Sequence, residues 1–324
     1  MKIYKCLLIN LCVLGAMGIC FFFVSLKSGE EVTKQQIETL AFINSVSVPE
    51  SVEFCGKKIS LDRYDMYERY DREINGFTYL HSSTMMLIKR ANRYFPVIEP
   101  ILKKHNIPDD FKYLAVIESS LNPRAISVAK AAGLWQFMTD TAKGFGLVVN
   151  EQVDERYHIE KSTEAACKYL NQAYSKYGDW GSVAASYNAG MGKISSELNN
   201  QMVNTSFDLL LVEETSRYVF RILAIKEIFN NPYKYGFVLK KDDLYPLIRT
   251  KKVEISTSIS DLAAFAKEHN INYYQLKDFN IWLRGRDLNI STKHNGYVID
   301  IPVVEDLYYS KNKAKIHNKA WVVE

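Results

Sequence analysis

Apolar residues recur at three-to-four spacing along much of this 324-residue chain, as on one buried face of an α-helix. The clearest stretches are Met85–Phe95, Phe111–Ile117 and Tyr218–Phe229. Proline and glycine supply the expected helix breaks, at Pro96, Pro108, Pro123, 144–146, 178 and 190–192. Strand-like runs are scarce before residue 236. The pattern predicts a compact all-helical domain over residues 76–235 with short loops.

The pattern changes after this domain. Residues 252–255 and 297–301 are rich in β-branched residues, and between them lie two short helical patterns at 260–268 and 273–279. We therefore expect a small βααβ module within residues 236–303. Residues 304–324 have basic patches and little periodicity, so we expect a poorly ordered tail.

The N-terminus predicts the compartment. Cys6–Leu26 carries no formal charge over 21 residues and follows Lys2 and Lys5, so it is long enough to span a membrane with its N-terminus inside. Its exit has no small-residue cleavage site, and no small residue precedes any of the cysteines within it. We favour an uncleaved anchor over residues 1–26, rather than a cleaved signal peptide or a lipoprotein. Residues 27–75 would form a spacer and an N-terminal helical region.

Charge and cysteine content exclude several classes of function. The chain has 41 basic and 37 acidic residues, so it offers no electrostatic basis for binding nucleic acid. Outside the anchor the cysteines are Cys55 and Cys167, which leaves one disulfide possible. Cys167, however, shares a helical pattern with Tyr169 and Tyr174 that is typical of a buried core. Metal-binding motifs are absent and the six histidines are scattered, so we expect no metal and no cofactor.

Glu118 is the strongest candidate for a chemical role. It shares a helix face with Phe111 and Leu114, and burial on that face would raise its pKa toward the range of a general acid at neutral pH. Alternatively, its carboxylate reaches solvent or caps the next loop. The nearest acids in sequence are Asp110 and Asp140, so no local partner supports the common two-carboxylate glycosidase mechanism. A lone buried glutamate suits a reaction in which the substrate supplies its own nucleophile.

Four blocks around and after Glu118 resemble the signature of the soluble lytic transglycosylase family. They are Glu118–Ala125 with Ala132–Met138, Val153–Arg156 with Ser162–Ala166, Ala184–Gly192, and Glu214–Val219. Lys130, Thr139 and Ser186 depart from the usual pattern without removing an ionisable or sugar-facing residue. The resemblance implies a mainly α, lysozyme-like catalytic domain.

The resemblance also implies a reaction. Glu118 would protonate the β-1,4 glycosidic oxygen between N-acetylmuramic acid and N-acetylglucosamine, then deprotonate the muramyl 6-hydroxyl to give a 1,6-anhydromuramyl end. The substrate would be peptidoglycan on the periplasmic side of a bacterial envelope. Substrate-binding roles fall on five residues: Ser119, Gln136, Tyr187, Asn188 and Tyr218. The hydroxyl of Ser119 could instead bind a backbone carbonyl.

The C-terminal βααβ unit resembles a degenerate LysM module, which implies binding of glycan N-acetylglucosamine. A module that merely packs on the helical domain remains the alternative. Two other functions also stay open: hydrolysis of the same bond by water, as in goose-type lysozymes, and noncatalytic binding of peptidoglycan.

Overall fold

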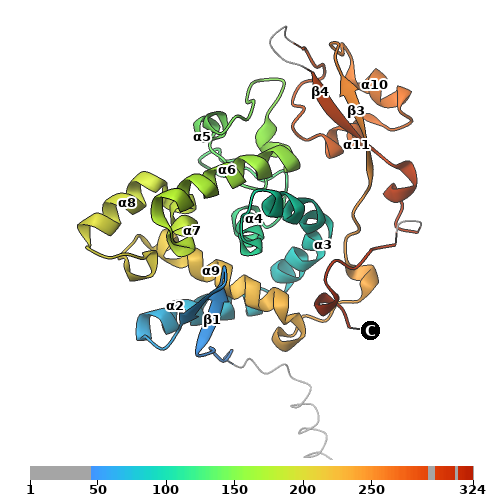
Figure 1. Ribbon diagram of the computed structural model, residues 1–324. Helices are drawn as coiled ribbons and strands as arrows, with labels where there is room; N and C mark the ends of the chain where they lie inside the picture. Colours follow the sequence, from blue (N-terminus) through green and yellow to red (C-terminus); the bar gives the residue numbers. More distant parts are fainter. Residues whose placement is uncertain (1–44, 291–295, 311–312, 324) are drawn as a thin grey trace, which may run out of the picture. The chain divides into compact units, whose positions relative to one another are not determined.

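Helices dominate the first part of the computed structural model, which describes residues 45–290, 296–310 and 313–323 (Figure 1). The α-helices of this part are α2 (Tyr64–Tyr79), α3 (His81–Lys104), α4 (Lys112–Ser119), α5 (Thr139–Gly144), α6 (Ile159–Tyr177), α7 (Trp180–Ala189), α8 (Met191–Asn200) and α9 (Glu213–Asn230). Short 3-10 turns include η1 (Asp109–Phe111), η2 (Glu155–Tyr157) and η7 (Lys319–Trp321). The expected helical domain is confirmed.

Local capping explains several helix boundaries. Helix α6 ends at Tyr177 because Gly178 adopts a left-handed conformation with φ 63°. The next residue, Asp179, begins α7 by accepting a hydrogen bond from the backbone N–H of Ser182 at 2.9 Å. Together these residues turn the chain between two packed helices. The predicted breaks at residues 178 and 190 are confirmed.

The predicted break at Pro96 is wrong, because α3 continues through both Pro96 and Pro100. Each proline removes one backbone donor from the helix. Yet Ile88, Phe95 and Leu102 lie fully or almost fully buried along the same helix. Packing of this apolar face stabilises the helix more than the prolines weaken it.

Residues 46–60 belong to the folded domain rather than to a spacer. Strands β1 (Ser51–Phe54) and β2 (Lys57–Ser60) form an antiparallel hairpin in which Phe54 and Ile59 are buried in the main core. The two-residue turn has positive φ at Cys55 (51°) and Gly56 (80°), as a tight hairpin turn requires. The predicted spacer is therefore corrected from residue 46 onward.

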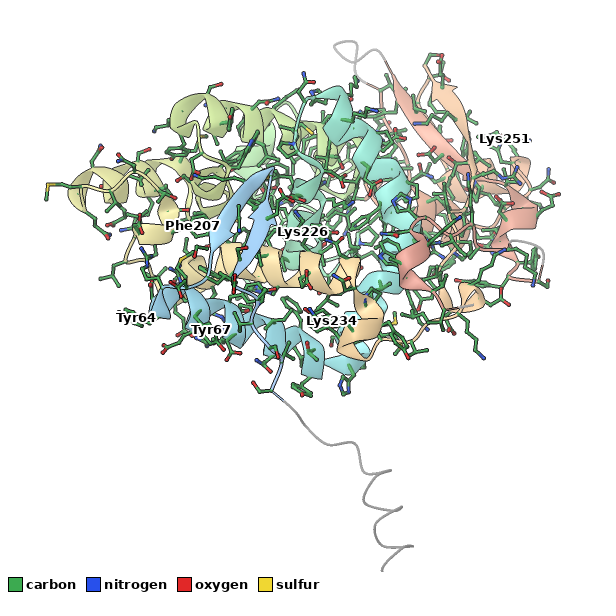
Figure 2. The ribbon with its side chains drawn as sticks, turned by 60° about the horizontal axis from the view of Figure 1, so that its bottom comes forward. Tyr64, Tyr67, Phe207, Lys226, Lys234 and Lys251 are labelled. Atoms are coloured by element: carbon green, nitrogen blue, oxygen red, sulfur yellow. The ribbon has the colours of Figure 1, made fainter. Side chains whose placement is uncertain are left out.

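Lys226 of α9 fastens this hairpin to the helices. Its Nζ donates to the backbone oxygen of Glu53 at 2.9 Å and pairs with the carboxylate of Asp110 at 2.7 Å (Figure 2). The same carboxylate accepts the backbone N–H of Cys55 at 2.6 Å. One half-buried charge cluster thus joins β1, η1 and α9.

The expected poorly ordered tail is wrong for its last described residues. Trp321 is 2% exposed and its indole Nε1 donates to the carbonyl of Phe229 at 2.9 Å. Its ring also lies 6.0 Å from that of Phe95, between centroids. An aromatic side chain near the end of the chain thus fills a gap between α3 and α9.

The predicted βααβ module is confirmed. Strands β3 (Thr250–Ile255) and β4 (Tyr297–Pro302) pair antiparallel, and α10 (Leu262–Glu268) and α11 (Tyr273–Phe279) lie between them in sequence. The core of the module includes the buried side chains of Leu276, Trp282 and Ile299, and Val153 and Tyr157 of the helical domain pack into the same cluster.

Several other predictions concern single features. No helix among the described residues is long and apolar enough to cross a membrane, and the predicted anchor, Cys6–Leu26, lies outside those residues. Cys55 and Cys167 are free, and Cys167 is fully buried as expected. Tyr169 is also buried, whereas Tyr174 is 39% exposed and stacks on Trp180.

Candidate active site

Glu118 lies in the last turn of α4, and the five residues that precede Glu118 in this helix are all buried. The helix ends where Ser120 adopts the left-handed conformation, with φ 53° and ψ 33°. The hydroxyl of Ser119 donates to the carbonyl of Ala115 at 2.9 Å, which is the backbone alternative foreseen for this residue. The core therefore fixes the helix that carries Glu118.

The carboxyl of Glu118 faces α9. Its Oε1 accepts a hydrogen bond of 2.5 Å from the hydroxyl of Tyr218, which is 2% exposed. Burial raises the pKa of Glu118 to about 7, although the Tyr218 hydrogen bond and the charge of Arg221 act in the opposite direction. A carboxyl with such a pKa is half protonated near neutrality and can either donate or accept a proton.

One face of α9 supplies the surroundings of Glu118. Glu214, Tyr218 and Arg221 stand at positions i, i+4 and i+7, so their side chains leave the helix on the same side. The charge of Glu214 raises the pKa of Glu118 and that of Arg221 lowers it. Sequence reasoning identified Tyr218 and missed the two charged residues, although their helical spacing from Tyr218 was visible.

The side chains of Tyr187 and Gln136 both hydrogen-bond to the backbone of the loop that follows α4. The hydroxyl of Tyr187 donates to the carbonyl of Trp135 at 2.8 Å, and its pKa is raised well above its usual value by burial and by the charge of Glu118. Nε2 of Gln136 donates to the carbonyls of Gly133 at 2.8 Å and Ala125 at 3.3 Å. Tyr218 rather than Tyr187 therefore makes the direct hydrogen bond to Glu118.

Asn188 connects the two helices that bear these tyrosines. Its Oδ1 accepts a hydrogen bond of 2.7 Å from the hydroxyl of Thr215 in α9. Its amide nitrogen makes no hydrogen bond to another residue in the described part of the chain. The structure thus places Asn188 beside the start of α9, one residue after Tyr187.

Arg156 fixes the loop that carries Gln136. The buried guanidinium pairs with Asp154 through Nε at 2.9 Å and Nη2 at 2.8 Å. Its Nη1 also donates to the carbonyls of Lys130 at 2.9 Å and Phe137 at 3.2 Å. Sequence analysis included Val153–Arg156 in a matching block but assigned it no role. The structure shows that Arg156 positions residues 130–137.

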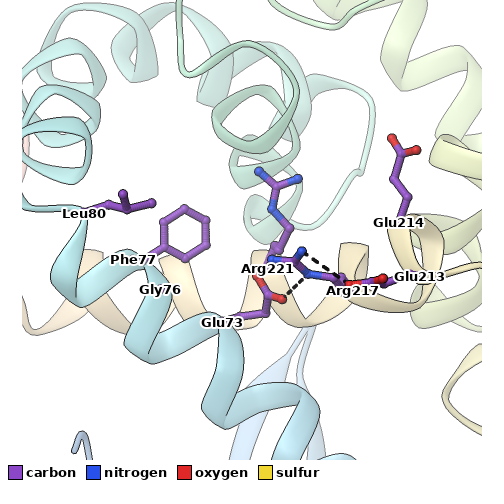
Figure 3. A pocket seen from close by; sticks show the side chains of 8 residues that line it. All are labelled: Glu73, Gly76, Phe77, Leu80, Glu213, Glu214, Arg217 and Arg221. Carbon is purple, nitrogen blue, oxygen red and sulfur yellow. Dashed lines mark hydrogen bonds and ion pairs between the residues drawn. The ribbon is translucent and has the colours of Figure 1, made fainter.

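A cavity of about 590 Å³ lies between α2 and α9 (Figure 3). Its apolar lining comes from α2 and the residue that follows it: Gly76, Phe77 and Leu80. The charged lining comes from both helices: Glu73, Glu213, Glu214, Arg217 and Arg221. Glu214 and Arg221 of this lining share a face of α9 with Tyr218, which is bonded to Glu118, so the cavity adjoins the candidate active site.

Across the described ranges, no group of three or more histidine, cysteine, aspartate or glutamate side chains is placed to hold a metal ion. What the site does offer is the carboxyl of Glu118, two tyrosine hydroxyls, two amides and an arginine. These groups can transfer a proton and bind hydroxyl, acetamido and carboxylate groups.

Two family models match the chain. Residues 95–207 match the family described as Transglycosylase SLT domain, and residues 251–305 match the Soluble lytic transglycosylase C-terminal LysM-like domain. Glu118, Gln136, Tyr187 and Asn188 fall in the first match, whereas Tyr218 follows it.

The chain is 31% identical over 229 residues to membrane-bound lytic murein transglycosylase D of Escherichia coli K12, which covers 69% of this chain and 49% of that protein. It is also 30% identical over 136 residues to membrane-bound lytic murein transglycosylase F of Yersinia enterocolitica, covering 39% and 26% of the two chains. The chain therefore spans about half the length, or less, of these curated relatives.

Among solved structures, it is similar to the 70-kDa soluble lytic transglycosylase of Escherichia coli, with 25% identity, a TM-score of 0.36, and coverage of 42% of this chain and 24% of that one. The first family match lies within the helical part of the molecule and the second covers the βααβ module. The chain thus contains a transglycosylase SLT domain followed by a LysM-like domain of the soluble lytic transglycosylase type.

Proposed function

We propose that this chain is a peptidoglycan lytic transglycosylase in which Glu118 serves first as general acid and then as general base. The observation that carries the proposal is the environment of Glu118. Its carboxyl is buried beside α9, bonded to the hydroxyl of Tyr218, and has a pKa raised to about 7. No second carboxylate is hydrogen-bonded to it among the described residues. The SLT-domain match supports this assignment.

The proton follows a closed path. Protonated Glu118 gives its proton to the oxygen that links C1 of N-acetylmuramic acid to O4 of N-acetylglucosamine, and the C1–O4 bond breaks. The carboxylate then takes the proton of the muramyl 6-hydroxyl while O6 bonds to C1. The product is a 1,6-anhydromuramyl end, no water is consumed, and Glu118 returns to its protonated form.

The neighbouring groups support this double role. Burial keeps Tyr218 and Tyr187 protonated, with pKa values well above the usual range, so the Tyr218 hydroxyl can donate to the carboxylate that forms after the first step. Gln136 uses its amide nitrogen on two loop carbonyls, which leaves its oxygen to accept from a sugar hydroxyl or acetamido N–H.

The proposal extends to the place of action. The LysM-like domain would bind the same glycan strands, and the apolar segment Cys6–Leu26 would hold the enzyme at the membrane on the periplasmic side of the envelope. The names of both curated relatives, membrane-bound lytic murein transglycosylases, support an envelope location.

Digestion of purified peptidoglycan by the full chain tests the proposal. Muropeptides released by the parent should carry anhydromuramyl ends, which are lighter than hydrolysed ends by one water. Glu118→Gln cannot transfer the proton, so its rate should fall by roughly 10³-fold or more. Mass spectrometry of the released muropeptides measures both results.

Glu151→Gln is the matched control, because Glu151 is exposed on a loop and its loss should leave the rate unchanged. Reducing ends in the parent digest would favour a hydrolase instead. Full activity in Glu118→Gln would remove Glu118 from the mechanism.

A further inference from the structure

Arg221 lines the α2–α9 cavity, and no role has yet been assigned to its positive charge. Its side chain is half-buried, and its guanidinium makes no hydrogen bond or ion pair with another residue of the described ranges. By contrast, Arg217 in the same cavity pairs with Glu73 at 2.6 Å, and Glu213 pairs with Arg72 at 2.6 Å. Among the described residues, Arg221 is therefore a partly desolvated cation without a partner.

Its position relative to the reacting groups is well defined. Arg221 follows Tyr218 by three residues, so the two side chains are neighbours on one face of α9. Tyr218 in turn donates to Glu118 at 2.5 Å. A ligand group bound by Arg221 would thus belong to the part of the substrate next to the bond that is cleaved.

Figure 3 shows how the side chain is presented. The guanidinium of Arg221 projects away from the backbone of α9, and no interaction joins it to Glu214, which projects from the same face. Phe77 and Leu80 line the neighbouring wall of the cavity. The cavity therefore offers an unpaired cation beside apolar surface.

This chemistry selects an anion attached to an apolar chain. A guanidinium in a partly buried site binds carboxylates through two parallel hydrogen bonds, and partial desolvation strengthens that interaction. The disaccharide backbone of peptidoglycan is uncharged. Its carboxylates lie on the lactyl group of muramic acid and on the peptide that this group carries.

We propose that Arg221 binds a carboxylate of the lactyl-peptide substituent of muramic acid, with the α2–α9 cavity receiving that substituent. The proposal rests on the proposed function and adds to it a residue that determines specificity. It requires strands that carry an accessible carboxylate to bind more tightly than strands in which this group is neutral.

Binding is measured by calorimetry in the Glu118→Gln background, so that turnover does not interfere. The probes are short glycan strands in three forms: with intact peptides, with peptides removed by an amidase that leaves the lactyl carboxylate, and with all carboxylates converted to methylamides. Arg221→Gln should raise the Kd for intact strands about tenfold, the effect of losing one charge-assisted hydrogen-bonded pair. It should leave the Kd for methylamide strands unchanged, and Arg221→Lys should recover part of the affinity.

Lys58→Gln is the control, because it removes the same charge from the exposed face of β2. An effect of Arg221→Gln on amidase-treated strands identifies the lactyl carboxylate, and its absence there identifies the peptide. Equal losses on intact and methylamide strands, or no loss on any strand, would overturn the proposal. Failure of the proposed function has a different signature: the parent would release no anhydromuramyl product whatever the calorimetry shows.

Discussion

The behaviour of Glu118 results from opposing influences on one carboxyl. Burial raises its pKa, whereas the hydrogen bond from Tyr218 and the charge of Arg221 lower it, and the result is about 7. With burial alone the pKa of the carboxyl would be higher still and it would release its proton less readily, whereas in water it would be ionised at neutral pH and have no proton to donate. The proximity of one donor and one cation therefore makes a single group able to serve in both steps.

Tyr218→Phe should show this balance directly. Without the hydroxyl, the pKa of Glu118 should rise above 7, because the hydrogen bond favours the charged form. The first step needs protonated Glu118, so kcat/KM falls as pH rises through this pKa. The alkaline limb of the pH profile should move to higher pH, and the maximum rate should fall about tenfold.

Steady-state rates between pH 5 and 9 measure the shift. Tyr177→Phe is the control, because its hydroxyl donates to the carbonyl of Met191 at 2.7 Å and should not affect the pH profile. An alkaline limb that stays in place, or moves to lower pH, would contradict the assigned role of the Tyr218 hydroxyl.

The sequence identified Glu118 because helical spacing reveals which residues share a face. Spacing does not reveal which of two tyrosines on different helices will meet that face. Tyr187 and Tyr218 were both expected to bind substrate, and the direct hydrogen bond to Glu118 belongs to Tyr218. Arg221 was missed because what distinguishes it is the lack of a partner among the residues that the structure describes, and this becomes visible only in the folded molecule.

At the scale of elements, periodicity predicted the long helices and glycines predicted their ends. The predictions that failed, at Pro96 and at β1 and β2, have a common cause: tertiary packing outweighed the local sequence signals. Pro96 lies inside α3 because the helix buries one whole face. The four-residue strands β1 and β2 are too short to show a clear alternation, yet Phe54 and Ile59 anchor them in the core.

The loop between α4 and α5 depends on Gly133. Its φ is +78°, and a Cβ there would lie 1.9 Å from the carbonyl oxygen of Arg156. Gly133→Ala must therefore displace the Arg156 segment or the loop that carries Gln136. We expect it to lower the free energy of unfolding by about 2–4 kcal/mol and to reduce activity sharply.

Urea unfolding and the muropeptide assay measure the two effects of Gly133→Ala. Gly144→Ala is the matched control, since Gly144 is helical in α5 and a Cβ there meets nothing within 4 Å. It should leave activity intact and change stability by less than about 1 kcal/mol. If Gly133→Ala proved as stable and active as the parent, the loop would not be fixed in the way the contacts indicate.

At the scale of the whole described unit, the segment Asp154–Arg156 makes hydrogen bonds in both the helical domain and the LysM-like domain. The backbone N–H of Asp154 donates to the carbonyl of Trp282 in the LysM-like domain at 2.8 Å, and the carboxylate of Asp154 accepts from Arg156 at 2.9 Å. Arg124, close after Glu118, pairs with Asp278 of α11 at 2.6 Å. The LysM-like domain is therefore joined to the same residues that position the active-site loop.

His158 should make this junction sensitive to pH. Its ring stacks on Trp282 with centroids 5.7 Å apart, and burial together with the charge of Lys161 lowers its pKa to about 4. The surrounding charges are those of Lys161, Glu155, Lys252 and Glu164. Since the unfolded chain takes up this proton near pH 6.5 and the folded chain does not, the free energy of unfolding should fall as pH falls from 7.5 to 5.0. The contribution of His158 to this fall is about 2 kcal/mol.

His158→Phe keeps an aromatic ring that cannot take up the proton, and it should remove that part of the pH dependence in urea unfolding. The same substitution at the exposed His81 should not. An undiminished slope in His158→Phe would show that another group controls the stability of the junction.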